Sequence, residues 1–278
     1  MKKRKDSLSR LLSLLVHGSA LITVGLLIFL IGYILIQGVP NLFLPGLFDW
    51  KYNSTNQSMM PSIINTIIMT ALTLVMAVPV GVFSAIYLVE YAKKGNKLVK
   101  LIRTTAETLS GIPSIVYGLF GYILFVLTLG GGYTLLSGAI TLAIMVLPLI
   151  MRTTEEALLA VPDSFREGSF GLGAGRLRTV FQVVLPTAVP GILSGVILAI
   201  GRIVGESAAL IFTAGTNPVV PNSLFASTST LSVHMYTLLT EGLHTPQAYA
   251  TAVVLLVVVI GINALSGALA KKLASKQQ

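Results

Sequence analysis

Arg202 and Glu206 are two charged residues within a long apolar stretch of this 278-residue chain. Residues four apart share one face of a helix, so a helix here carries both charges on one side. The arginine presents a planar fork of donors that suits a tetrahedral oxyanion. The glutamate can accept a proton from hydrogen phosphate, whereas sulfate has none to give. The alternative interpretation is that the two charges only neutralise each other.

The composition indicates a membrane protein. Of the residues, 54% are hydrophobic and 10% are charged, whereas soluble domains have roughly 25% charged residues. An arginine at the bilayer centre costs roughly 2.5–3.5 kcal/mol on insertion scales, which favours a functional role for Arg202. The chain has no cysteine and three scattered histidines, so we expect no metal site and no thiol chemistry. Its basic residues do not gather with aromatic ones, which argues against nucleic-acid binding.

Six membrane-spanning helices are predicted from the uncharged stretches. Residues 108–151 carry no charge and would extend roughly 66 Å as one helix, twice the bilayer thickness, so they must turn once, at residues 130–132. They therefore form spans three and four. The first span is longer than a signal-peptide core, and we expect it to be retained. The other predicted spans are residues 20–36, 52–89 with a helix start at Pro61, about 185–214, and about 249–270.

The basic residues predict the orientation. Alternating spans place the N-terminus, residues 92–104, residues 152–186 and the C-terminal tail on one side, and 17 of the 19 Lys and Arg residues fall there. By the positive-inside rule that side is the cytoplasm, so both termini are expected to be cytoplasmic. The outer loops, about 38–60 and 215–248, show no sign of a soluble domain.

The longest inside segment, residues 152–186, predicts two short helices lying at the membrane surface. Pro162 starts the first helix, and Gly171, Gly173 and Gly175 at alternate positions favour a sharp bend after it. A plain amphipathic linker would show a similar pattern. The apolar face of the second helix would carry Leu177, Val180, Phe181 and Val184.

This segment resembles the EAA loop of ABC importer permeases, whose pattern is Glu-Ala-Ala, three residues, Gly, nine residues, Ile-x-Leu-Pro. Glu167, Gly173, Leu185 and Pro186 match in register, while Gly168, Ser169 and Val183 depart from the pattern. The resemblance implies that these four matching residues couple the chain to a cytoplasmic ATPase. The chain has no Gly-rich loop ending in Gly-Lys-Ser/Thr, so we expect no cofactor here, and ATP and Mg on the partner ATPase.

Two further segments are similar to phosphate importer permeases. Residues 201–210 read GRIVGESAAL, where the family pattern is GRxxGETAPL, and residues 111–121 read GIPSIVYGLFG, close to a signature of the same permeases. Ser207 and Ala209 depart from that pattern, and Ala209 removes an expected kink. Residues 85–92, AIYLVEYA, favour the PstA-type subunit over its PstC-type partner.

The resemblance implies an all-α, six-helix protein with the type I ABC importer permease (MetI-like) fold. Residues 1–60 would hold the first span and outer loop, residues 61–270 the transport core, and residues 271–278 a cytoplasmic tail. The implied partners are a PstC-type second permease, two ATPase subunits and an extracytoplasmic phosphate-binding protein, all at the cytoplasmic (inner) membrane with its lipid. Arg202 and Glu206 would line the substrate pathway by alternating access.

Small residues predict bends and packing faces. Gly111 and Pro113 predict a bend in span three, and Gly201 with Gly205 predicts a packing face. Gly191 with Gly195 predicts another, and we expect both faces to contact a second permease. Two further expectations are a dipole-stabilised Glu107 at a helix start without a transport role, and three histidines at surfaces or interfaces.

Three alternative functions remain open from the residues. The same architecture would serve for sulfate or molybdate, and a passive anion channel would share its hydropathy. An intramembrane enzyme would need a nucleophile and base, or a metal set, inside the spans, and none is visible beyond Arg202 and Glu206.

Overall fold

The regular structure of this chain is helical throughout the part that the computed structural model describes, residues 2–93 and 95–274. The predicted all-α class is confirmed. The long helices are α1 (Lys2–Gly38), α2 (Met60–Ile86), α5 (Leu135–Leu159), α8 (Leu185–Gly205) and α11 (Thr245–Ala274). The short ones are α3 (Lys97–Ser110), α4 (Ser114–Gly121), α6 (Asp163–Gly171), α7 (Arg176–Thr179), α9 (Ala208–Thr213) and α10 (Leu231–Glu241). One 3-10 helix, Val39–Phe43, and three π-helical segments, Tyr87–Tyr91, Tyr122–Thr128 and Val180–Val184, extend or join them.

Six spans can be counted in the described residues when one of them is taken as broken. Five stretches are long and apolar enough to cross a bilayer. The sixth is the pair Lys97–Ser110 and Ser114–Thr128, which passes the same test together but bends by 102°. The predicted number of spans therefore holds, with span three interrupted. The five continuous stretches are Leu11–Phe43, Met60–Tyr91, Leu135–Leu159, Arg176–Gly205 and Thr245–Leu265.

The break in span three falls at residues 111–113, where the sequence predicts a bend. Pro113 is extended, with φ −59° and ψ 142°, and a proline disfavours helical geometry in the residue before it. The helix therefore ends at Ser110 and a new one begins at Ser114. The chain therefore forms two separate helices here, and the angle between them is larger than the bend that a proline makes within one helix.

The turn between spans three and four lies where three consecutive glycines predict it. Gly130 and Gly132 have φ of +65° and +68°, a conformation that glycine adopts without strain. The Thr134 side chain then accepts a hydrogen bond from the Ser137 N–H and starts α5. The predicted hairpin is confirmed.

Helix α5 is longer than predicted. The inside loop was expected to begin at Arg152, but α5 continues to Leu159. Nothing breaks the helix before Pro162, and the Arg152 Nε donates to Glu156 one turn on, at 3.2 Å. Residues 152–159 therefore extend span four, with Thr154 and Leu158 buried, and the segment that connects spans four and five is shorter than predicted.

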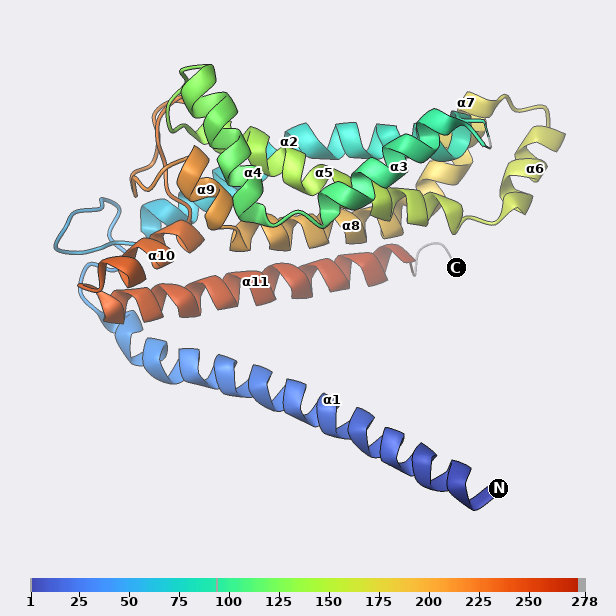
Figure 1. Ribbon diagram of the computed structural model, residues 1–278. Helices are drawn as coiled ribbons and strands as arrows, with labels where there is room; N and C mark the ends of the chain where they lie inside the picture. The colour runs from blue at the N-terminus through green and yellow to red at the C-terminus, as the bar shows by residue number, and fades with distance from the viewer. Residues whose placement is uncertain (1, 94, 275–278) are drawn as a thin grey trace.

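The core lies where α2, α5 and α8 pack together (Figure 1). Gly191 and Gly195 of α8 belong to this contact, because a Cβ on Gly195 would lie 2.0 Å from Thr153 Oγ1 and one on Gly191 2.7 Å from Ala157 Cβ. The expectation that this glycine pair contacts a second permease is wrong: it packs against α5 of the same chain. By contrast, Gly205 has nothing within 4 Å.

The bundle has two distinct ends, and helix α1 diverges from it (Figure 1). One end carries α6 and α7 and is called the α6 end here; the other, the α10 end, carries α9, α10 and the long loops. Helix α1 touches α11 near Gly38, then swings away towards the side of the α6 end. The division of the chain near residue 60 stays a prediction. Of the predicted tail, residues 275–278 lie outside the described residues, and residues 271–274 continue α11.

The second long loop contains a helix that the sequence analysis missed. Helix α10 carries His234, which is 3% exposed, contacts the ring of Tyr52 edge-on, and has Nε2 3.4 Å from the Gln57 carbonyl oxygen. The expectation of a surface or interfacial histidine is wrong here. Burial lowers the pKa of His234 to about 4, although the Gln57 carbonyl opposes this shift.

This burial predicts acid sensitivity at the α10 end. The pKa of about 4 in the folded chain lies below the ordinary 6.5, so the unfolded chain takes up the proton first as pH falls. Stability is full above pH 6.5 and declines towards pH 4, with a loss of about 2 kcal/mol between pH 7 and pH 5. Thermal melting of the purified protein at these two pH values measures this. His234→Gln should remove most of the difference, and an unchanged pH dependence in that variant would contradict the assignment.

Candidate functional site

Arg202 lies in the last turn of α8, which ends at Gly205. Glu206 follows in extended conformation, with φ −74° and ψ 129°. The prediction that both charges lie on one face of one helix is therefore wrong, because the helix stops between them. Gly205 offers little helix propensity at this point, and Ser207 precedes a new helix.

Glu206 serves this helix break. Its side chain is buried, and its Oε1 accepts a hydrogen bond from the Ala209 N–H at 3.0 Å, in the first turn of α9. The carboxylate thereby satisfies one free donor of α9 and places negative charge at the positive end of that helix. The Ser232 hydroxyl of α10 donates to the Glu206 carbonyl oxygen, so the break is also held from the α10 end.

Arg202 has no hydrogen bond and no ion pair with any of the described residues. The interpretation that Glu206 simply neutralises it therefore has no geometric support. The Tyr117 hydroxyl of α4 donates to the Leu109 carbonyl oxygen at 2.8 Å. A half-buried arginine in a span is expected to face a partner or water, and no partner for Arg202 lies among the described residues.

The surroundings of Arg202 are formed by close helix contacts. A Cβ on Gly118 of α4 would lie 2.7 Å from Ala209 Cα of α9, so the two backbones touch there. Tyr117 neighbours this contact, and the sequence analysis did not single it out for a role. A Cβ on Gly205, which lies three residues after Arg202 and so on the same face of α8, would meet nothing within 4 Å, whereas one on Gly201 would meet Asn263 Oδ1 at 3.8 Å.

The α6 end presents the residues of the predicted coupling loop. Glu167 is exposed on α6 and has no partner among the described residues. Gly173 has φ +81° and turns the chain after α6, as its place in the glycine series predicts. Large apolar side chains are also exposed on this loop, which is typical of a protein interface. They are Phe165, Phe170 and Leu172, the last 92% exposed.

Leu185 and Pro186 do not end a separate surface helix. Helix α7, the π-helical segment Val180–Val184 and α8 form one continuous rod, so the predicted second helix of a helix-turn-helix is the start of span five. The wider π turn, in which the Leu185 N–H donates to the Val180 carbonyl oxygen, relieves the crowding that Pro186 brings to a helix. The first of the two predicted helices, α6, is present.

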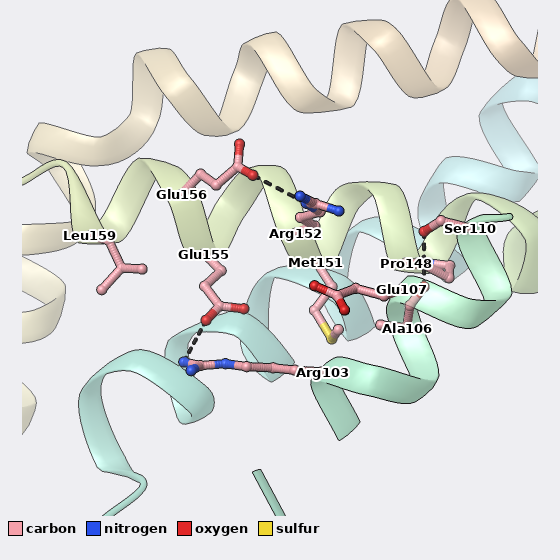
Figure 2. A pocket seen from close by; sticks show the side chains of 10 residues that line it. All are labelled: Arg103, Ala106, Glu107, Ser110, Pro148, Met151, Arg152, Glu155, Glu156 and Leu159. Atoms are coloured by element: carbon pink, nitrogen blue, oxygen red, sulfur yellow. Dashed lines mark hydrogen bonds and ion pairs between the residues drawn. The ribbon is translucent and has the colours of Figure 1, made fainter. Parts of the chain in front are cut away.

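A cavity of about 200 Å³ opens between α3 and α5 (Figure 2). Arg103 pairs with Glu155 at 2.5 Å across it, and Arg152 pairs with Glu156 on its rim. Glu107 also lines it, from the last turns of α3. The prediction that Glu107 stands near a helix start is wrong. With three carboxylates against two paired arginines, this cavity is no anion site by itself.

Metal chemistry finds no support in the described residues. Across residues 2–93 and 95–274, no three histidine or carboxylate side chains come close enough together to hold a metal ion. Arg202 at the helix break and Glu167 at the α6 end are two charged groups without an ion pair among these residues.

Broken helices, an arginine inside the spans with no partner among the described residues and an exposed loop at the α6 end are typical of a multi-pass transport protein. Residues 77–276 match the family described as binding-protein-dependent transport system inner membrane component. This match covers most of the chain, and the chain therefore belongs to that family of inner-membrane transport subunits. It is a transport subunit and not an enzyme.

Individual relatives agree with this family. The probable ABC transporter permease protein YqgI of Bacillus subtilis (strain 168) is 37% identical, over 84% of this chain and 83% of its own. The phosphate transport system permease protein PstA 1 of Mycobacterium tuberculosis (strain ATCC 25618 / H37Rv) is 34% identical, over 77% of this chain and 69% of its own. An inward-facing MetNI methionine ABC transporter structure superimposes with a TM-score of 0.60 at 21% identity, over 77% of this chain and 93% of that one. The expected MetI-like fold is confirmed.

Proposed function

We propose that this chain is a permease subunit of an ATP-driven importer of inorganic phosphate. The relatives named as phosphate transport permeases support this substrate. The observation that carries the proposal is Arg202, a guanidinium inside the spans with no partner among the described residues. Its planar fork of donors can form two hydrogen bonds to one tetrahedral oxyanion. A bound anion would therefore pair with the guanidinium, which has no protein partner among the described residues.

Glu206 distinguishes phosphate from other oxyanions. Its Oε1 is engaged with the Ala209 N–H, while Oε2 has no hydrogen bond to the described residues. This second oxygen accepts a hydrogen bond from the hydroxyl of hydrogen phosphate, whereas it repels sulfate or molybdate, which carry no proton at neutral pH.

The working assembly pairs the chain with a second, PstC-type permease, two ATPase subunits and an extracytoplasmic phosphate-binding protein. ATP and Mg bind the ATPases, which dock on α6 around Glu167 and Gly173. The α6 end is the cytoplasmic end. This orientation rests on the 17 of 19 basic residues that the spans place on that side, and it makes both termini cytoplasmic.

Transport then proceeds by alternating access. ATP-driven closure of the ATPases moves α6, the bundle opens at the α10 end, and phosphate passes from the binding protein to Arg202. The return movement opens the α6 end, where the carboxylates of the cavity between α3 and α5 disfavour rebinding of the anion.

Reconstitution tests this proposal directly. The chain is purified with its co-purifying subunits, placed in vesicles and supplied with binding protein, labelled phosphate and ATP. We expect ATP-dependent uptake that excess unlabelled phosphate abolishes and that sulfate and molybdate leave unchanged. Competition by sulfate or molybdate would contradict the substrate, and uptake without ATP or ATPase would favour a passive channel.

A further inference from the structure

Arg166 of α6 lies on the opposite side of that helix from solvent and ties three parts of the chain together. Its Nε and Nη2 donate to Glu90 Oε1 at 3.1 and 2.7 Å. Its Nη2 and Nη1 also donate to the carbonyl oxygens of Leu158 and Val161, at 2.9 and 2.8 Å. One guanidinium therefore joins the end of span two, the end of α5 and the turn into α6.

This ion pair is among the least exposed charges of the described residues. The side chains of Arg166 and Glu90 are 14% and 8% exposed. Glu90 stands in the π-helical segment Tyr87–Tyr91, and a π turn redirects a side chain relative to a regular helix. A buried ion pair with this many hydrogen bonds is held in one geometry, whereas water competes with the hydrogen bonds of an exposed ion pair.

Adjacent residues of α6 therefore face different ways. Glu167 points to solvent, where an ATPase can reach it, while Arg166 turns inward to span two. Two further contacts fasten the same region. Arg176 of α7 lies over the ring of Tyr91 at 5.7 Å, and the hydroxyls of Ser169 and Thr179 are 2.8 Å apart.

The contacts continue from this pair towards the substrate site. Helix α2, which continues into the π-helical segment that bears Glu90, packs along α5, and α5 packs along α8, whose last turn bears Arg202. Movement of α6 can thus be transmitted to the helix break through a series of packed helices, and the first contact in that series is the ion pair.

We propose that Glu90 and Arg166 are positioning residues that transmit movement of the coupling helix α6 to span two. This inference rests on the proposed function, because it assigns the pair a place between the ATPase and the substrate path. Breaking the pair should uncouple ATP hydrolysis from transport without releasing the ATPase, which binds the outer face of α6.

The test measures phosphate imported per ATP hydrolysed in vesicles that hold the complete complex. In Glu90→Gln, which keeps the side-chain shape and loses the charge, we expect this ratio to fall about tenfold while ATP hydrolysis stays within about twofold. Arg166→Lys keeps the charge and loses the planar fork of donors, so its ratio should fall by a similar factor. This variant replaces Glu90→Gln in the test if the Glu90→Gln complex does not assemble. Glu90→Asp should recover most of the ratio.

Asp163→Asn is the matched control, because Asp163 contacts the same guanidinium at 3.2 Å but is 87% exposed. Its ratio should equal that of the wild type. A wild-type ratio in Glu90→Gln and Arg166→Lys would overturn the inference, and so would loss of the ATPase from these complexes, since the pair would then only hold the loop. Absence of ATP-driven phosphate uptake in the wild-type complex would instead contradict the proposed function.

Discussion

Arg202→Gln should abolish phosphate uptake while the complex assembles and its ATPase stays bound. The guanidinium has no partner among the described residues, so its removal costs the fold little. It removes instead the paired donors offered to the anion, which are worth about 3 kcal/mol and correspond to a loss of about 100-fold. Labelled phosphate uptake in reconstituted vesicles measures the effect. Arg202→Lys keeps the charge without the fork and should retain part of the activity.

Lys100→Gln is the control for this experiment, because it removes one positive charge from an exposed position of α3. Its uptake should match that of the wild type. Normal uptake by Arg202→Gln would disprove the place of Arg202 in the substrate pathway. A large loss of thermal stability in that variant would show that Arg202 has a structural partner in the assembled complex.

Glu167→Lys should disconnect the chain from its ATPase. Glu167 is exposed and has no partner among the described residues, so the permease itself should fold and insert normally. A reversed charge at the centre of the docking helix opposes the partner surface, and reversal of a buried interfacial charge costs several kcal/mol. We expect uptake to fall at least about tenfold, together with loss of ATPase from the purified complex.

The matched control is Glu241→Lys, the same reversal at an exposed position of α10 at the opposite end of the bundle. It should leave ATPase binding unchanged. Retention of ATPase and full uptake by Glu167→Lys would contradict the coupling role. Because Arg202→Gln keeps the ATPase and Glu167→Lys loses it, the two variants separate the substrate pathway from the coupling loop.

Much of the architecture could be predicted because it depends on local physics. Uncharged stretches of bilayer length become helices, since only a helix satisfies its backbone within the hydrocarbon region. Gly130 and Gly132 take the positive φ that the hairpin requires, and Pro113 interrupts span three. Likewise Gly173 turns the chain behind α6.

Three of the errors concern where a helix begins or ends. Arg202 and Glu206 lie four apart, but the helix ends at Gly205 and separates them. Glu107 was assigned to a helix start, but α3 ends three residues after it, at Ser110. The sequence predicts a helix boundary at Leu185 and Pro186, but a π turn carries the helix through them.

By itself, the sequence determined the membrane class and the number of spans, because hydropathy and charge act over a few residues; the sides of the loops and the coupling role of Glu167 stay predictions. Only the tertiary structure decided that Arg202 has no partner among the described residues, that Glu206 caps α9, and that Arg166 meets Glu90 from 76 residues away. Such pairings depend on which helices lie side by side. That choice belongs to the packing of the whole bundle, and no local pattern along the chain records it.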